Sequence, residues 1–132
     1  MSIEANKQVT RRFVEAVRDG DMGTAEALQH PDCSWWLLGR GDLSRETFNT
    51  LVRGGILRSL SRSIEITAMT AEGDRVAYEA EGEMVFPDCV YRNRYHNLLM
   101  IRDGLILHGR EYMDTLAATE AGLRKPEAAA SE

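Results

Sequence analysis

The stretch from Val90 to Asp114 holds the side chains best suited to chemistry. Asp103-Gly104 separates two apolar runs, and this dipeptide between extended segments is a strong β-hairpin signal. Alternation along the first strand of this hairpin places one set of side chains on a single face, namely Tyr91, Asn93, Tyr95, Asn97, Leu99 and Ile101. The set is polar far from the turn and apolar near it, as expected for one wall of a half-apolar cavity.

Glu111 is the most unusual residue of the returning strand. Alternation places it on one face with Gly109 and Met113, while Arg110 and Tyr112 point to the other face. A carboxylate between these two neighbours is poorly solvated unless it has a partner or a chemical role. Two interpretations therefore stand: an ion pair with an arginine at a cavity rim, or a functional carboxyl group.

Three helices are predicted before these strands. Apolar residues recur at helical spacing over residues 3–19, with Ser2 as a suitable N-cap, and Gly20 ends this pattern. Asp21 and Ser44 are suitable N-caps for a second and a third helix. The second helix must end before Pro31, because a proline disfavours helical geometry in the residue preceding it.

The remaining periodic segments predict strands. Residues 33–38 form an early strand with two apolar faces, so Trp35 and Trp36 must point in opposite directions. We assign Trp36 to the substrate pocket. Residues 63–71 and 76–85 alternate about a Gly73-Asp74 turn and form a second hairpin.

These elements predict an α+β fold, in which helices pack on one face of a curved, mainly antiparallel sheet. One domain is expected over residues 1–116, followed by a flexible tail over 117–132, where apolar content falls. The other face of the sheet presents Leu98, Met100 and Tyr112. Because such a face is too apolar to remain widely exposed, we expect a homodimer formed through the sheet.

Composition excludes several classes of partner. The 132 residues carry a formal net charge of -5, which argues against nucleic-acid binding. Cys33 and Cys89 lack disulfide or metal-ligand spacing, and the three histidines add none, so we expect reduced thiols, a cytoplasmic location and no metal. No apolar run approaches the length of a signal peptide or a membrane span, so no membrane association is expected.

The order of elements, together with VYRNRY, IRDGLI and REYMDT, resembles the SnoaL-like branch of the nuclear transport factor 2-like superfamily, also called ketosteroid-isomerase-like. The resemblance covers about residues 3–116. It implies a cone-shaped fold with three N-terminal helices on a strongly curved sheet, enclosing a pocket for a small apolar molecule. Members include polyketide cyclases, ketosteroid isomerases, limonene-epoxide hydrolases, dehydratases and non-catalytic binding domains, so the fold does not determine the activity.

The resemblance also implies roles for individual residues. In several enzymatic branches, the acid that Glu111 matches works from the pocket wall. An apolar pocket would raise its pKa, which suits a general acid or base near neutral pH. Tyr91, Asn93 and Tyr95 are natural donors for orienting a substrate carbonyl or hydroxyl group. The alternative is that the tyrosines serve only in packing.

Glu79 and Glu81 have two conflicting interpretations. Their alternation is most simply a solvent-exposed face, whereas the resemblance implies that this acidic face looks into the pocket, where they could contact substrate. A pocket location would allow Glu81 to share a proton with Glu111. Limonene-epoxide hydrolases carry an Arg-x-Asp pair near this position, and its absence here argues against epoxide hydrolysis by that arrangement.

We therefore expect a cofactor-independent enzyme that performs acid-base chemistry on a small apolar substrate, of the isomerase, cyclase or dehydratase type. Glu111 would be the catalytic residue. The alternative function is a non-catalytic ligand-binding or dimerisation domain on the same fold.

Overall fold

The computed structural model describes residues 2–123. Its elements follow the order α1 (Ile3–Asp19), α2 (Met22–Ala27), β1 (Gln29–Leu37), β2 (Gly41–Ser44), α3 (Arg45–Arg58), β3 (Ser61–Glu72), β4 (Arg75–Val85), β5 (Val90–Arg102), β6 (Leu105–Glu111) and α4 (Thr115–Glu120). Within these residues, no helix is long and apolar enough to cross a membrane.

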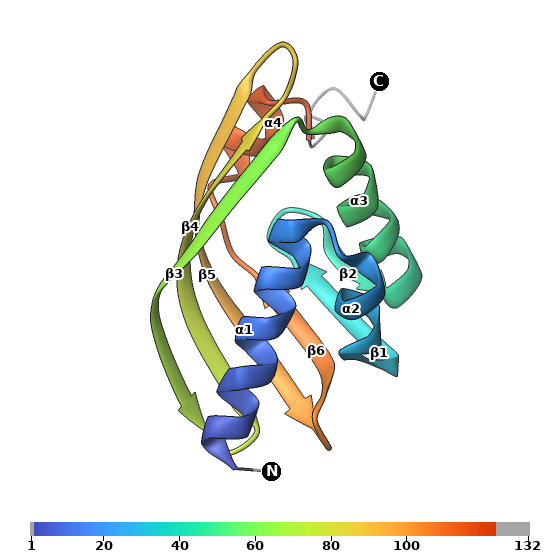
Figure 1. Cartoon of the computed structure of the whole chain (residues 1–132), viewed down its shortest axis with the longest axis vertical. Coiled ribbons are helices and arrows are strands. Elements are labelled where there is room, and N and C mark those ends of the chain that lie inside the picture. Colours follow the sequence, from blue (N-terminus) through green and yellow to red (C-terminus); the bar gives the residue numbers. More distant parts are fainter. Residues whose placement is uncertain (1, 124–132) are drawn as a thin grey trace.

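A single curved sheet organises the chain, with strand order β2-β1-β6-β5-β4-β3. Neighbouring strands are antiparallel except β1 and β6, which run parallel. Helices α1, α2 and α3 lie on the concave face (Figure 1). The predicted α+β class is confirmed, with β2 and α4 as additional elements.

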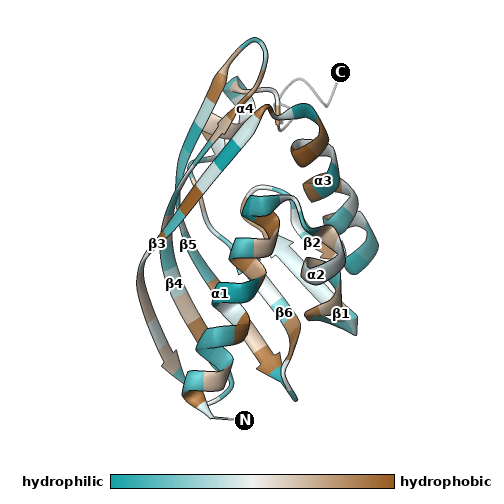
Figure 2. Cartoon of the chain, viewed as in Figure 1, coloured by the Kyte–Doolittle hydropathy of each residue, from teal (hydrophilic) through white to brown (hydrophobic). Residues whose placement is uncertain are grey.

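Helix α1 begins and ends as its sequence predicts. The Ser2 side chain accepts a hydrogen bond from the Ala5 amide, and Gly20 adopts a left-handed conformation at φ 75° that closes the helix. Figure 2 shows polar and apolar residues interleaved along α1, as expected for a helix with one buried stripe. That stripe packs against the sheet.

The core is organised around Trp35 of β1, which is almost completely buried. Its indole stacks on Phe48 with ring centroids 3.8 Å apart and on Phe13 with centroids 5.5 Å apart. The ring also lies directly on Gly109 of β6, where a Cβ atom would overlap it. Trp35 thus joins α1, α3 and two strands, and Trp36 faces outward.

Arg62 at the start of β3 connects the ends of two helices. Its guanidinium donates to the carbonyl of Arg18 in α1 at 3.1 Å and to the carbonyl of Ile56 in α3 at 3.4 Å. It also donates to the Ser59 hydroxyl at 2.8 Å. A cation at two helix C-termini satisfies carbonyls that have no intrahelical partner.

Helix α4 packs on the far end of the sheet, where Ala118 contacts a small cluster with Phe86 and Tyr91. Asp114 caps this helix by accepting hydrogen bonds from the amides of Leu116 and Ala117. The domain boundary predicted after residue 116 therefore falls inside α4. Of the predicted tail, residues 117–123 are ordered against the domain, and 124–132 lie outside the described residues.

Candidate active site

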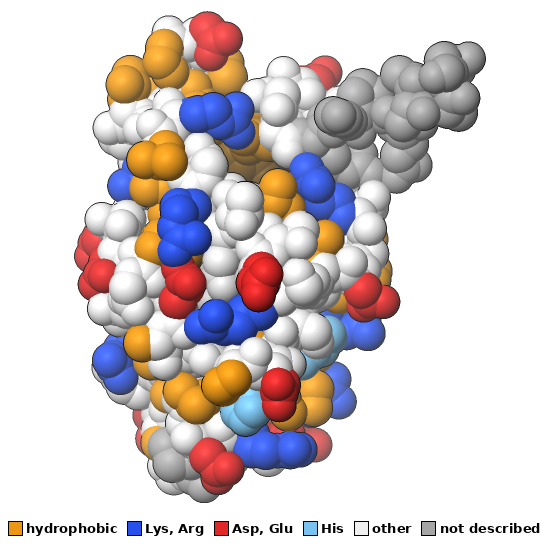
Figure 3. All heavy atoms as spheres, turned by 90° about the vertical axis from the view of Figure 1, so that its right-hand side faces the viewer, with side chains coloured by type: hydrophobic (Ala, Val, Ile, Leu, Met, Phe, Trp, Pro, Cys, Tyr) orange, Lys and Arg blue, Asp and Glu red, His pale blue; other side chains and the backbone are white. Residues whose placement is uncertain are grey.

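The concave face of the sheet and helices α1 and α3 enclose a cavity of about 290 Å³. Its wall is mainly apolar and includes Phe13, Val17, Leu51, Val52, Ile64 and Met84. Figure 3 shows a hollow with hydrophobic side chains inside it and basic side chains on either side. The polar lining on the sheet comes from Ser63, Tyr78, Glu83, Tyr91, Tyr95, Asn97 and Glu111. A pocket of this size and polarity suits a small, largely apolar molecule.

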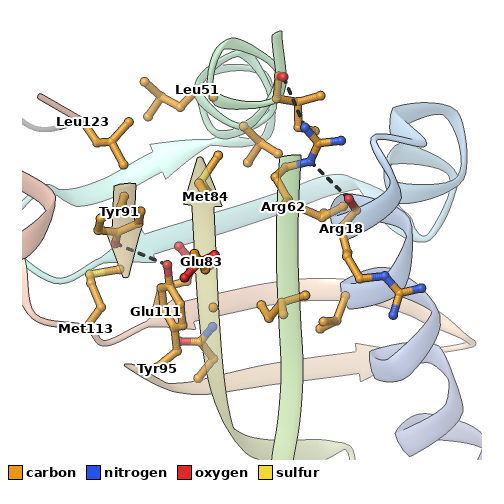
Figure 4. A pocket seen from close by; sticks show the side chains of 18 of the residues that line it. Arg18, Leu51, Arg62, Glu83, Met84, Tyr91, Tyr95, Glu111, Met113 and Leu123 are labelled. Atoms are coloured by element: carbon orange, nitrogen blue, oxygen red, sulfur yellow. Dashed lines mark hydrogen bonds between the residues drawn. The ribbon is translucent and has the colours of Figure 1, made fainter. Parts of the chain in front are cut away.

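Glu111 is the last residue of β6, and its side chain points into this cavity beside Tyr91 and Tyr95 (Figure 4). Among residues 2–123, no side chain forms an ion pair or hydrogen bond with its carboxyl group. Burial raises the pKa of Glu111 to about 7, because the charged form loses hydration without gaining a partner. The group remains partly accessible through the cavity, where a ligand could reach it.

Arginines line the cavity as well, but they bond elsewhere. Arg18 pairs with Asp19 at 2.8 Å, and Arg40 donates to the carbonyl of Leu123 at 3.1 Å. Arg58 lies over the ring of Phe86, at 5.7 Å from its centroid. With Arg62 bound to helix ends, no arginine in the described part of the chain forms the predicted ion pair with Glu111.

Tyr91 and Tyr95 line the cavity together. The Tyr95 hydroxyl donates to the Tyr91 hydroxyl at 3.2 Å, and this bond is drawn in Figure 4. Burial raises the pKa of both phenols, and the negative charge of Glu111 raises them further. Both groups therefore remain protonated donors near neutral pH. The structure brings these two predicted residues to the same place as Glu111.

Asn93 lies behind this layer and does not line the cavity. Its amide nitrogen donates to the Tyr91 hydroxyl at 2.6 Å and to the carbonyl of Asp114 at 2.9 Å. Its oxygen accepts from the amides of Arg94 and Asp114. The prediction that Asn93 contacts substrate is corrected: its hydrogen-bonding groups are used within the protein, and it holds Tyr91.

Tyr78 was absent from the predicted site. This β4 residue lines the cavity, is buried, and accepts a hydrogen bond from Asn97 at 3.1 Å. Burial raises its pKa strongly, and the charge of Glu111 contributes. Val76 and Ala80, which share the inner face of β4 with Tyr78, are apolar, and this pattern indicated a face used only for packing. The available signal was that Tyr78 and Asn97 are polar residues on inward-facing positions of adjacent strands.

Glu79 and Glu81 lie on the convex side of β4 and are exposed. Glu81 is 3.5 Å from Arg94 across the strand pair, in a separate polar hollow on the outer surface. The pocket location implied by the resemblance is therefore wrong for both residues. Buried and more exposed residues alternate over residues 76–81 of the strand, so when Tyr78 and Ala80 point inward, both glutamates point outward.

Trp36 also lies outside the cavity. It contacts Tyr112 at a centroid distance of 5.1 Å, and the Arg110 guanidinium lies over its ring at 5.1 Å. The assignment of Trp36 to the pocket is corrected, because Trp35 occupies the only inward position of this pair and belongs to the core.

Within residues 2–123, no group of three or more histidine, cysteine, aspartate or glutamate side chains is arranged to hold a metal ion. Both cysteines are free thiols, and burial raises the pKa of Cys33 to about 11. The groups in the cavity best suited to acid-base chemistry are the carboxyl group of Glu111 and three phenols; the carboxylate of Glu83 also lines the cavity but is paired with Arg92 at 2.8 Å.

Solved structures share this fold. An LEH-like epoxide hydrolase from M. tuberculosis superposes with a TM-score of 0.78 at 18% identity, over 89% of this chain and 89% of that chain. IdmH from Streptomyces antibioticus, a candidate polyketide cyclase, gives 0.75 at 17% identity, over 89% and 98%. An NTF2-like protein from Burkholderia xenovorans LB400 gives 0.70 at 22% identity, over 92% and 98%.

No curated protein matches the sequence. A family model does: the SnoaL-like domain matches residues 10–109, which run from within α1 to within β6 and include α2, α3, β1 to β5 and the three tyrosines of the cavity wall, and which end two residues before Glu111. With this match and the cone-like enclosure of one apolar cavity by helices and a curved sheet, the chain belongs to the SnoaL-like domain family, within the NTF2-like fold.

Proposed function

We propose that this protein is a cofactor-independent enzyme that transfers protons to and from carbon on a small apolar substrate. The observation that carries the proposal is the state of Glu111. Its carboxyl group faces an apolar cavity, has no bonding partner among the described residues, and has a pKa raised to about 7. A carboxyl group with this pKa can both accept and return a proton near neutral pH.

The mechanism begins with ionised Glu111. Its carboxylate removes a proton from a carbon adjacent to a carbonyl group, and the electron pair of the broken C–H bond moves toward the carbonyl oxygen. The Tyr91 hydroxyl, supported by Tyr95, stabilises the negative charge that develops on that oxygen. Protonated Glu111 then completes the reaction by returning its proton.

The destination of that proton distinguishes the three reaction types. Return to a different carbon gives isomerisation, and transfer to a departing hydroxyl group gives dehydration. Cyclisation follows when the enolate attacks a second carbonyl of the same molecule, whose new alkoxide takes the proton. The fold similarity to IdmH, a candidate polyketide cyclase, supports including cyclisation among these outcomes.

Proton exchange into a ketone tests the proposal directly. We expect the protein to catalyse deuterium incorporation beside the carbonyl of 2-decalone, a bicyclic ketone, in D₂O, with a rate that rises with a midpoint near pH 7. Glu111→Gln should abolish this exchange, and Glu81→Gln should retain it, because Glu81 is exposed on the outer face. If Glu111→Gln exchanges the ketone at the wild-type rate, the proposal fails, and ketone binding without exchange supports the non-catalytic binding domain.

We further propose a cytoplasmic homodimer formed through the convex face of the sheet. Tyr112 is 36% exposed there, next to Trp36, and Leu98 and Met100 are only partly buried. An apolar surface of this kind is stabilised when a second copy covers it. Sedimentation equilibrium should give a dimer mass for the wild type and a monomer mass for Leu98→Glu; a monomeric wild type would contradict this assembly.

A further inference from the structure

Asparagines and tyrosines form two matching pairs beside the cavity. Asn93 and Asn97 both lie on β5, and each donates its side-chain N–H to a phenol oxygen, that of Tyr91 at 2.6 Å and that of Tyr78 at 3.1 Å. All four side chains are buried. Buried polar groups of this kind have few alternative partners, so their hydrogen bonds determine one orientation.

The orientation of the Asn97 amide is set by the backbone. Its oxygen accepts a hydrogen bond at 3.1 Å from the backbone N–H of Tyr112, the residue that follows Glu111. The nitrogen must then face Tyr78, so the Tyr78 oxygen is an acceptor in this contact. The Tyr78 O–H proton has no acceptor among the described residues, although this tyrosine lines the cavity.

Asn93 fixes the direction of the hydrogen bond to Tyr91 in the same way, with the phenol oxygen as the acceptor. Its oxygen accepts two backbone N–H groups, which leaves only its nitrogen for the phenol. The Tyr91 oxygen also accepts the O–H of Tyr95 at 3.2 Å, so both of its lone pairs are used. The remaining O–H group of Tyr91 has no acceptor within residues 2–123 and can donate only into the cavity.

We infer that Asn93 and Asn97 are positioning residues, which turn the O–H groups of Tyr91 and Tyr78 into the cavity as a pair of donors for one substrate oxygen. Tyr78 thereby becomes a substrate-binding residue. The inference deepens the proposed function, because it identifies the substrate as a molecule that presents a carbonyl or similar acceptor oxygen to the tyrosine wall. Leaving either donor unpaired in the cavity disfavours ligands without such an oxygen.

Binding of 2-decalone and of trans-decalin, the corresponding hydrocarbon, tests the inference at pH 8.5. At this pH Glu111 is ionised and can only accept a hydrogen bond, because its pKa is about 7, whereas the buried phenols stay protonated. Only a phenol among these groups can then donate to the ketone. The carbonyl stretching frequency of bound 2-decalone should fall below its value in hexane.

Two variants separate the donor from its positioning residue. Tyr78→Phe removes the hydroxyl and should weaken 2-decalone binding roughly tenfold without weakening trans-decalin binding. Asn97→Asp keeps the oxygen that accepts from Tyr112 but replaces the N–H donor with an acceptor, which turns the Tyr78 O–H away from the cavity. Asn97→Asp should reduce the ketone affinity and the carbonyl frequency shift as much as Tyr78→Phe does. The double variant Tyr78→Phe/Asn97→Asp should reduce them no further.

The outcomes are distinct from those of the deuterium exchange test. A carbonyl frequency that is unchanged by Tyr78→Phe overturns the inference, as does equal weakening of ketone and hydrocarbon binding, which would indicate a structural role. A wild-type protein that shifts the carbonyl frequency but does not catalyse exchange contradicts the proposed catalysis alone. If Asn97→Asp does not fold, Tyr78→Phe still decides whether Tyr78 donates to the ketone.

Discussion

The indole of Trp35 lies against the backbone of Gly109, in space that any side chain at position 109 would occupy. The contact joins β1 to β6 two residues before Glu111. It therefore fixes the position of the strand that carries the proposed acid-base group, as well as the position of the largest buried side chain.

Gly109→Ala should destabilise the protein by about 2 to 3 kcal/mol, because the added methyl group displaces a closely packed ring. Gly54→Ala is the matched control. A Cβ atom at Gly54 in α3 meets nothing within 4 Å, so alanine there should stabilise the helix by about 0.5–1 kcal/mol. Urea unfolding measures both changes, and equal stabilities for the two variants would contradict this packing.

The stability of the protein should fall as pH rises from about 4.5 to about 7. The first value is the ordinary pKa of a glutamate, and the second is the pKa of Glu111 in the folded protein. In this window folded Glu111 holds a proton that the unfolded chain releases, so each increase in pH favours unfolding. The shift corresponds to a loss of order 3 kcal/mol. Glu111→Gln removes the titration, so its stability relative to wild type should rise by a similar amount across the window.

Unfolding curves at pH 4.5 and pH 8 measure that difference, with Glu81→Gln as the control that changes charge outside the cavity. Its stability relative to wild type should stay nearly constant, because exposed pairs such as Glu81 and Arg94 contribute little. A Glu111→Gln variant that follows the wild type at both pH values would show that the carboxyl group is not buried.

Arg62→Met should cost about 1–3 kcal/mol, because the carbonyls of Arg18 and Ile56 lose a charged donor at the ends of two helices. Arg94→Met makes the same chemical change at an exposed position and should cost less than about 1 kcal/mol. Thermal unfolding compares the two directly. Similar losses would indicate that Arg62 contributes only surface charge.

Ala118→Asp should detach α4, since the carboxylate would enter the cluster formed by Phe86 and Tyr91. Hydrogen exchange of the amides in residues 115–123 should accelerate, while the amides of β5 near Leu99 remain protected. Ala117→Ser is the control, because Ala117 is only partly buried and a hydroxyl group there should disturb α4 less. Unchanged protection in α4 would contradict the contact.

Local signals predicted most of the fold. Ser2 and Gly20 delimit α1 at the predicted residues, and strict alternation in β5 separates its inner from its outer side chains. Each of these features depends on neighbours in the sequence, so one chain is sufficient to recognise it. Strand β2 was not predicted, because its four residues are too few to show a periodic pattern. It pairs only with β1.

The errors at the site came from non-local contacts. Trp35 and Trp36 lie in a strand whose two faces are both apolar, and the inward choice is decided by Gly109, more than seventy positions later. For Glu79 and Glu81, composition indicated the correct face and the family resemblance the wrong one. Tyr78 was missed because its hydrogen-bond partner, Asn97, belongs to another strand.

The parallel pairing of β1 with β6 has a consequence for synthesis of the protein. Residues 29–37 can complete their strand contacts only after residues 106–111 exist, because these two segments lie side by side in the sheet. Such distant pairing forms slowly, since a long loop must close first. In a ribosome-bound chain, the β1 edge that pairs with β6 therefore stays unpaired until β6, the last strand, has emerged. Until then Trp35 also lacks its contact with Gly109.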